Sequence, residues 1–197
     1  MPIDKQRNLI FVHIPKCAGT SIEKALGIYG KPECWHGVGL PQHWTLNKIV
    51  ERYGEQILDD NFVFAFVRNP WDRIVSEFNY LHKISDPAVR GRGFPWFVEN
   101  VVDGKTSCSQ HVAVHLRPQS DFLANYEDKV DFIGRFENLQ KDWVELGERL
   151  GKSLPKLGHE NKSPHFGIDH RSSYNETTKQ IVQDIYQNDI KFFDYSF

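Results

Sequence analysis

Residues 62–67 read Phe-Val-Phe-Ala-Phe-Val, an uninterrupted apolar run of six residues. Such a run is typical of a strand covered on both faces in a parallel sheet, whereas a half-exposed strand alternates polar and apolar residues. We therefore expect a central strand here. Asn69 and Pro70 come just after it and suit the N-cap and the first position of a helix, so the sequence predicts a helix from Pro70 to about His82.

Two further segments repeat the pattern of a strand followed by a helix. Residues 9–14 are apolar and rich in β-branched side chains, and residues 20–26 carry helix formers behind a glycine. Residues 130–136 are strand-like, and residues 137–150 place apolar side chains on one helical face. This alternation predicts an α/β fold with a parallel sheet flanked by helices.

The rest of the chain predicts one irregular loop and two helices. Residues 31–46 are rich in Gly, Pro, His and Trp and predict a loop before a short helix at residues 46–53. The last predicted helix covers residues 176–194. We expect its apolar and aromatic side chains to be core, namely Ile181, Ile185, Phe192, Phe193, Tyr195 and Phe197.

The composition fits one compact domain that covers residues 1–197. The chain has 197 residues, of which 40% are apolar and 13% aromatic, and this supply of core residues excludes an intrinsically disordered protein. The 24 Lys and Arg residues against 26 Asp and Glu residues give a net charge of −2. We therefore expect no nucleic-acid partner, and any anion site must be local.

Neither a membrane span nor an export signal is expected. The longest apolar run has six residues, far below the ~20 that cross a bilayer. The apolar segment at residues 9–14 lacks the length and the cleavage pattern of a signal peptide. The three cysteines, Cys17, Cys34 and Cys108, form no CxxC pair, and their odd number favours free thiols. These features predict a cytoplasmic protein.

Residues 13–21 read His-Ile-Pro-Lys-Cys-Ala-Gly-Thr-Ser and follow the first predicted parallel strand, where open sheets bind ligands. Gly19 permits close backbone approach, and the N–H groups of a helix start favour a phosphate. Lys16 adds a charge worth roughly 4 kcal/mol to an anion ~4 Å away at an effective dielectric of about 20. The stretch predicts an anion cradle. It is not an ATP loop of the GxxxxGK[ST] type, because Lys16 precedes Gly19 and Thr20.

A second polar stretch follows the central strand. Residues 68–76 read Arg-Asn-Pro-Trp-Asp-Arg-Ile-Val-Ser, so that Arg68 and Ser76 offer a guanidinium and a hydroxyl for a second phosphate. Simpler interpretations stay open for each residue. Lys16 is a solvated loop charge in one of them, Arg73 pairs with Glu77 in another, and Ser76 faces solvent in a third.

Together the two stretches resemble the donor-binding motifs of PAPS-dependent sulfotransferases. The closer match is to the family-2 group, which includes Golgi carbohydrate sulfotransferases and shorter bacterial relatives. Residues 13–21 resemble the 5′-phosphosulfate loop of these enzymes, and residues 68–76 resemble their 3′-phosphate motif. Similarity continues at residues 116–119, 133–139 and 186–193, so that the resemblance covers nearly the whole chain.

The resemblance implies a fold related to the P-loop kinases. It also implies transfer of a sulfuryl group from 3′-phosphoadenosine-5′-phosphosulfate (PAPS) to an acceptor hydroxyl, with carbohydrate favoured and no metal required. Lys16 would stabilise the charge that develops on the 5′-phosphate as sulfur departs. The other implied donor-binding residues are Ala18, Gly19, Thr20 and Ser21 at the 5′-phosphate, Arg68 and Ser76 at the 3′-phosphate, and Lys162 and Ser163 in a loop over the nucleotide.

A general base is needed to take the proton of the acceptor hydroxyl, a contribution of ~10² to 10⁴ in rate. Among nine histidines, His43 lies between the two donor stretches and resembles the base-bearing segment of some family-2 carbohydrate enzymes. His36 is the reserve. His13 and Glu23 are further alternatives, although His13 better suits fixing the loop by hydrogen bonding. In a purely structural interpretation, His43 caps the helix that follows it.

Several alternatives to this interpretation stay open. A zinc site is one of them, built from Cys108, His111 and His115 with His159, His165 or His170 as the last ligand. A nucleotide-binding regulator without transfer activity and a phosphotransferase are the other functional classes. Lys162 and Arg117 are solvated charges in the simplest interpretation. Three tryptophans offer either sugar stacking or core packing, namely Trp35, Trp44 and Trp96. The oligomeric state is not indicated.

Overall fold

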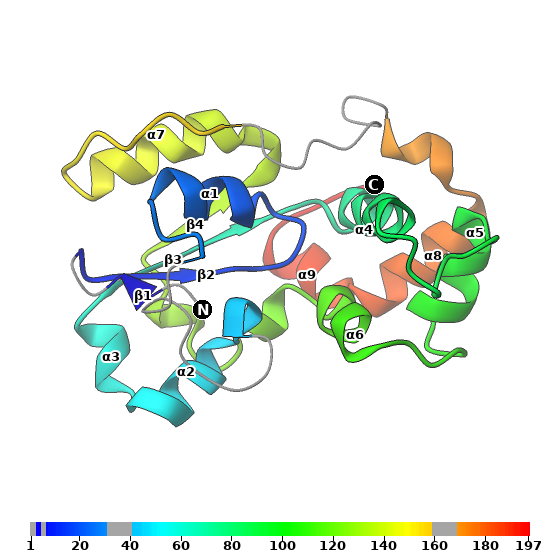
Figure 1. The fold of residues 1–197 in the computed structure, drawn as a ribbon, viewed down its shortest axis with the longest axis horizontal. Helices are drawn as coiled ribbons and strands as arrows, with labels where there is room; N and C mark the ends of the chain where they lie inside the picture. Colours follow the sequence, from blue (N-terminus) through cyan, green and yellow to red (C-terminus); the bar gives the residue numbers. More distant parts are fainter. Residues whose placement is uncertain (1–2, 5–6, 31–40, 159–168) are drawn as a thin grey trace. The chain divides into compact units, whose positions relative to one another are not determined.

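The computed structural model describes residues 3–4, 7–30, 41–158 and 169–197. The chain forms two compact units (Figure 1). The first unit comprises Met1–Val67 and Gln119–Asn161, and the second comprises Arg68–Pro118 and Lys162–Phe197. The predicted central strand therefore belongs to the first unit, and the helix predicted to follow it belongs to the second.

The first unit is built on a sheet whose described strands run in the order β1 (Ile3–Asp4), β2 (Leu9–Val12), β3 (Phe62–Val67) and β4 (Phe132–Arg135). β1 pairs with β2 in antiparallel fashion, while β2, β3 and β4 are parallel. Val63 to Val67 are all fully buried, as expected of a central strand. In register, Val12 lies opposite Ala65 and Val67 lies opposite Arg135, so the parallel strands end at one edge of the sheet.

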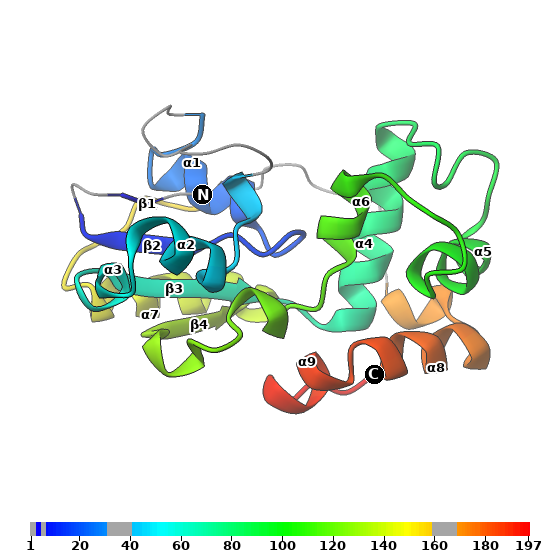
Figure 2. The same cartoon turned by 90° about the horizontal axis from the view of Figure 1, so that it is seen from below.

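Helices cover both faces of this sheet, which confirms the predicted α/β class. α1 (Gly19–Ala25) and α7 (Leu139–Arg149) lie on one side, and α2 (Leu46–Tyr53) and α3 (Gln56–Asp59) lie on the other (Figures 1 and 2). Short 3₁₀ turns complete the unit at Pro41–His43, Ser120–Phe122, Glu127–Lys129 and Phe136–Asn138.

The second unit is helical. Its described elements are α4 (Pro70–Lys83), α5 (Phe94–Phe97), a π-helical segment at Val98–Val102, α6 (Gln110–Leu116), a 3₁₀ turn at His170–Ser173, α8 (Glu176–Ile185) and α9 (Gln187–Phe192). Their apolar faces form one core that includes Trp71, Ile74, Phe97, Val182 and Tyr186. None of the helices in the described part of the chain is long and apolar enough to cross a bilayer.

The start of α4 is as predicted. The Asn69 side-chain oxygen accepts hydrogen bonds from the main-chain N–H groups of Trp71 and Asp72, at 3.0 and 3.4 Å. Pro70 occupies the first turn, where a missing N–H costs nothing. The helix then extends to Lys83, one residue beyond the predicted end.

Other predicted boundaries were too generous. The helix expected over residues 176–194 is interrupted at Tyr186 and forms α8 and α9. Phe192 was expected to be core but is 50% exposed, whereas Phe193 is 4% exposed. Successive helical residues point about 100° apart, so Phe192 points away from the direction in which Phe193 is buried. The strand predicted over residues 9–14 ends at Val12, because the chain turns where Ile14 N–H donates to the Val12 carbonyl.

Candidate active site

The loop between β2 and α1 has an unusual backbone. Lys16 and Ala18 both adopt left-handed conformations, with φ of 68° and 65°. Such a conformation costs a non-glycine residue of the order of 1–3 kcal/mol. The surrounding structure must therefore hold it in place. Left-handed residues in a tight turn let successive main-chain N–H groups converge, which creates a concave site for an anion.

Cys17, between these two residues, anchors the loop. Its side chain is buried, and its thiol lies within hydrogen-bonding distance of two acceptors, the Gln119 side-chain oxygen at 3.3 Å and the Pro15 carbonyl at 3.5 Å. Gln119 is also fully buried. The cysteine predicted to be a free thiol is therefore a structural residue of the loop.

Each predicted 5′-phosphate residue lies in or next to this loop. Lys16 and Thr20 are half-buried, and Ser21 is buried in the first turn of α1. α1 has only seven residues, so the charge at its end is a minor factor. The Lys16 ammonium and the N–H groups of the loop itself are the features that favour an anion here.

A buried pair lies directly against the loop. His13 Nδ1 is 2.6 Å from Glu23 Oε1, and both side chains are at most 5% exposed. The Gln42 amide donates to the same carboxylate, with 3.3 Å between Gln42 Nε2 and Glu23 Oε2. A carboxylate oxygen accepts, so the hydrogen lies on His13 Nδ1. The pair satisfies a carboxylate that burial would otherwise destabilise.

The His13 ring of this pair leaves no room for a side chain at position 19. A Cβ atom at position 19 would lie 1.8 Å from His13 Nε2, far inside van der Waals contact. The sequence indicated that Gly19 allows a ligand to approach the backbone. The structure adds a second reason, which is that the His13 ring occupies the space where a side chain would lie.

His43 lies next to His13. Its Nδ1 is 2.9 Å from the His13 carbonyl oxygen, and the two rings meet edge to face at a centroid distance of 4.6 Å. Thr45, not His43, caps α2, with its hydroxyl accepting from the Lys48 N–H at 3.2 Å. The alternative in which His43 merely caps that helix is therefore wrong. The first unit thus brings Lys16, His13, Glu23 and His43 together around one loop.

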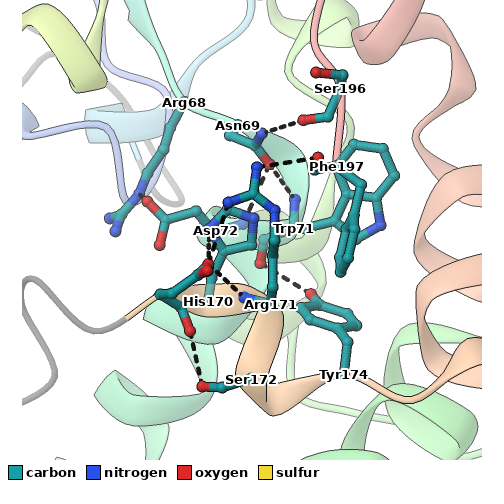
Figure 3. Close-up of polar contacts among 11 residues, drawn as sticks. Arg68, Asn69, Trp71, Asp72, His170, Arg171, Ser172, Tyr174, Ser196 and Phe197 are labelled. Carbon is teal, nitrogen blue, oxygen red and sulfur yellow. Dashed lines mark hydrogen bonds and ion pairs between the residues drawn. The ribbon is translucent and has the colours of Figure 1, made fainter.

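The predicted 3′-phosphate residues lie in the second unit. Arg68 Nε donates to Asp72 Oδ2 at 2.7 Å, and the Arg68 side chain is 12% exposed (Figure 3). Ser76 follows Asp72 by four residues in α4, so the two lie on the same helix face. His170 is near this pair. Burial lowers the pKa of His170, although the Asp72 carboxylate opposes the shift.

Arg73, in the same stretch, is a core residue. It is 1% exposed, and its Nη1 and Nη2 donate to the carbonyls of His115 and Arg117, both at 2.8 Å. The Tyr186 hydroxyl donates to the Leu116 carbonyl at 2.7 Å, and the Arg73 guanidinium lies 5.2 Å from the Tyr186 ring centre. Burial raises the pKa of Tyr186, which therefore keeps its proton. Arg73 thus holds the end of α6, and no hydrogen bond joins it to Glu77.

Two histidines of the zinc alternative, His111 and His115, take part in other contacts of the second unit. His115 Nδ1 is 2.9 Å from Glu77 Oε2, and both residues are buried. The rings of His111 and His115 lie 4.1 Å apart. In the part of the chain that the structure describes, no group of three or more His, Cys, Asp or Glu side chains is arranged to hold a metal ion.

The tryptophans differ in burial. Trp44 is 7% exposed and belongs to the core, as its simpler interpretation holds. Trp96 is half-buried, with the Arg92 guanidinium 4.6 Å from its ring centre. Seven residues named from the sequence lie outside the described residues, namely Cys34, Trp35, His36, His159, Lys162, Ser163 and His165.

Comparison with known proteins assigns the chain to a family. The model of the family described as "Sulfotransferase family" matches residues 1–196, a range that contains both polar stretches. A protein of Archaeoglobus fulgidus that is described as uncharacterized is 31% identical over 105 residues, which cover 52% of this chain and 78% of that protein. The chain belongs to the sulfotransferase family.

Proposed function

We propose that the protein transfers a sulfuryl group from PAPS to the hydroxyl of a carbohydrate. Family membership supports a sulfotransferase activity. The observation that carries the more specific proposal is the loop after β2, where Lys16 lies in a left-handed turn beside the buried His13–Glu23 pair. A fold related to the P-loop kinases is part of the same proposal.

In this proposal the loop after β2 holds the 5′-phosphosulfate. The donor supplies the sulfuryl group and a phosphate leaving group. Lys16 neutralises the charge that develops on the leaving oxygen, an interaction of roughly 4 kcal/mol at ~4 Å and an effective dielectric of about 20. The hydroxyls of Thr20 and Ser21 and the N–H groups of Ala18 and Gly19 bind the other phosphate oxygens.

Arg68 and Ser76 are assigned to the 3′-phosphate. A guanidinium has five N–H donors, of which the bond to Asp72 uses one. Asp72 thereby orients the Arg68 guanidinium. Lys162 and Ser163 stay predictions as residues of a loop over the nucleotide.

His43 is assigned as the general base. A carbonyl oxygen only accepts, so His43 Nδ1 carries the hydrogen that bonds to the His13 carbonyl. In the neutral ring the lone pair then lies on Nε2, which takes the acceptor proton as the new O–S bond forms and the S–O bond to the 5′-phosphate breaks. Glu23 is less suited, because His13 and Gln42 bind its oxygens and it is 2% exposed.

The donor assignment is tested by nucleotide binding. Calorimetric titration with adenosine 3′,5′-bisphosphate is compared with titration with 5′-AMP. We expect the bisphosphate to bind at least about tenfold more tightly, since one charge-assisted hydrogen bond contributes about 1.5–3 kcal/mol. Equal affinities would remove the roles of Arg68 and Ser76. Tight binding without sulfuryl transfer to any carbohydrate, lipid or small alcohol would favour the nucleotide-binding regulator.

The base is tested with His43→Ala. We expect bisphosphate binding within about twofold of the wild type and a kcat lower by ~10² or more, the contribution of a general base. His82→Ala is the matched control, because His82 is an exposed histidine of α4. Full activity of His43→Ala would show that another group takes the proton.

A further inference from the structure

Ser196 and Phe197 lie against the turn that carries Arg68 (Figure 3). Asn69 Nδ2 donates to the Ser196 carbonyl at 2.8 Å. The other atom of the same amide, Asn69 Oδ1, caps α4 by accepting from the N–H of Trp71 at 3.0 Å. One side chain therefore ties residues 196–197, called here the 196–197 anchor, to the first turn of α4.

Phe197 fills an aromatic site beside that turn. Its ring meets Trp71, Tyr174 and His170 edge to face, at centroid distances of 5.4, 5.6 and 5.9 Å. The Lys179 ammonium lies 4.6 Å from the centre of the same ring. Edge-to-face aromatic pairs and a cation over a ring are both attractive. The anchor is therefore held by its side chain as well as by Asn69.

The partners of Phe197 are themselves bound to α4 and to one another. The Tyr174 hydroxyl donates to the Trp71 carbonyl at 2.9 Å, and the Trp71 indole N–H donates to the Lys179 carbonyl at 3.2 Å. Arg171 Nη2 donates to the main-chain oxygen of Phe197 at 3.1 Å. A displacement of the ring would therefore be transmitted to the first turn of α4.

We propose that Ser196 and Phe197 are positioning residues of the 3′-phosphate site, acting through the turn that carries Arg68. This inference rests on the proposed function. Arg68 directly precedes Asn69, and its guanidinium is bonded to Asp72 in the first turn. A loosened turn moves both ends of that bond. Small misplacements of a binding group weaken it strongly, because charge-assisted hydrogen bonds depend on geometry.

The proposal predicts an effect confined to one phosphate. The anchor contacts the turn of Arg68 within the second unit, whereas the 5′-phosphate is assigned to the loop of Lys16 in the first unit. Loss of the anchor should therefore weaken a nucleotide that carries a 3′-phosphate. It should leave a nucleotide with only a 5′-phosphate unchanged. A general loss of stability would affect both.

The test compares Phe197→Ala with Phe192→Ala. Phe192 is a matched control, because it is 50% exposed and does not belong to the aromatic site. Each protein is titrated with adenosine 3′,5′-bisphosphate and with 5′-AMP. For Phe197→Ala we expect the bisphosphate Kd to rise about tenfold, because part of the free energy of one charge-assisted hydrogen bond is lost. The 5′-AMP Kd should stay within about twofold. The control should change neither value.

Asn69→Ser is the second variant, in case Phe197→Ala does not fold. Serine is as good an N-cap as asparagine, so this change keeps the cap of α4 and removes the donor to Ser196. We expect the same selective loss of bisphosphate affinity, by about threefold to tenfold, as one hydrogen bond contributes.

The outcomes separate the two proposals. If the wild type does not prefer the bisphosphate over 5′-AMP, the assignment of Arg68 fails. If the wild type prefers it and both variants keep the same ratio of affinities, the positioning role is wrong while the assignment of Arg68 stands. Equal weakening of both nucleotides in both variants would also overturn the positioning role.

Discussion

Replacing Gly19 with alanine should disrupt the loop after β2 through a single side chain. The new Cβ would lie 1.8 Å from His13 Nε2, so the ring must move by about 1.6 Å to reach ordinary contact at 3.4 Å. A shift of that size is incompatible with the 2.6 Å bond to Glu23. Losing a charged hydrogen bond costs about 1.5–3 kcal/mol, and overpacking adds about 1–3 kcal/mol. We expect Gly19→Ala to lower the free energy of unfolding by about 3–5 kcal/mol.

The same substitution should be harmless once the ring is gone. Gly19 has no left-handed φ, and alanine is better than glycine in a helix by up to about 1 kcal/mol. In a His13→Ala background, Gly19→Ala should therefore be neutral or stabilising. Urea unfolding of the wild type, both single variants and the double variant measures this coupling. An equal cost of Gly19→Ala in both backgrounds would refute the reasoning.

Three further substitutions test other parts of the structure. Lys16→Met should lower kcat by roughly 10²–10³ in a sulfuryl-transfer assay, since about 4 kcal/mol of charge stabilisation is lost; an unchanged kcat would contradict its role. Arg73→Met should lower the free energy of unfolding by about 3–5 kcal/mol, because the carbonyls of His115 and Arg117 lose the hydrogen bonds from Arg73. Urea unfolding measures this change, and an unchanged midpoint would argue against it. His170→Gln should reduce the loss of Tm that the wild type shows as the pH falls below about 6.5. Burial lowers the pKa of His170, so the unfolded chain binds more protons than the folded chain in this range. An identical dependence of Tm on pH in the variant and the wild type would contradict this.

The elements set by local chemistry could be predicted from the sequence. The apolar run at Phe62–Val67 identified β3 to the residue. Asn69 and Pro70 fixed the start of α4, because a cap and a missing N–H act within one turn. The sequence also predicted that residues 13–21 and 68–76 each follow a parallel strand, and β2 and β3 do end directly before them.

The contacts that hold the site were missed, because they join residues that are distant in sequence. Cys17 bonds to Gln119, 102 residues away, and no local pattern relates the two. Arg73 lies in the stretch that resembles the 3′-phosphate motif, but its side chain is buried against the end of α6, a packing that depends on the tertiary fold. The ion pair between Arg68 and Asp72 could have been predicted from the sequence, because a four-residue spacing favours an ion pair at a helix start.

Two buried carboxylate–histidine pairs show why burial and pairing do not by themselves identify a site. His115 and Glu77 lie 2.9 Å apart within the helical core of the second unit. His13 and Glu23 lie 2.6 Å apart and are equally buried. What differs is the neighbour of the ring, which for His13 is the backbone of Gly19 in the loop after β2. Electrostatic interactions are strong where water is excluded. The His115–Glu77 pair therefore lies within a packed helical core, whereas the His13–Glu23 pair lies beside the loop that we propose to bind the 5′-phosphosulfate.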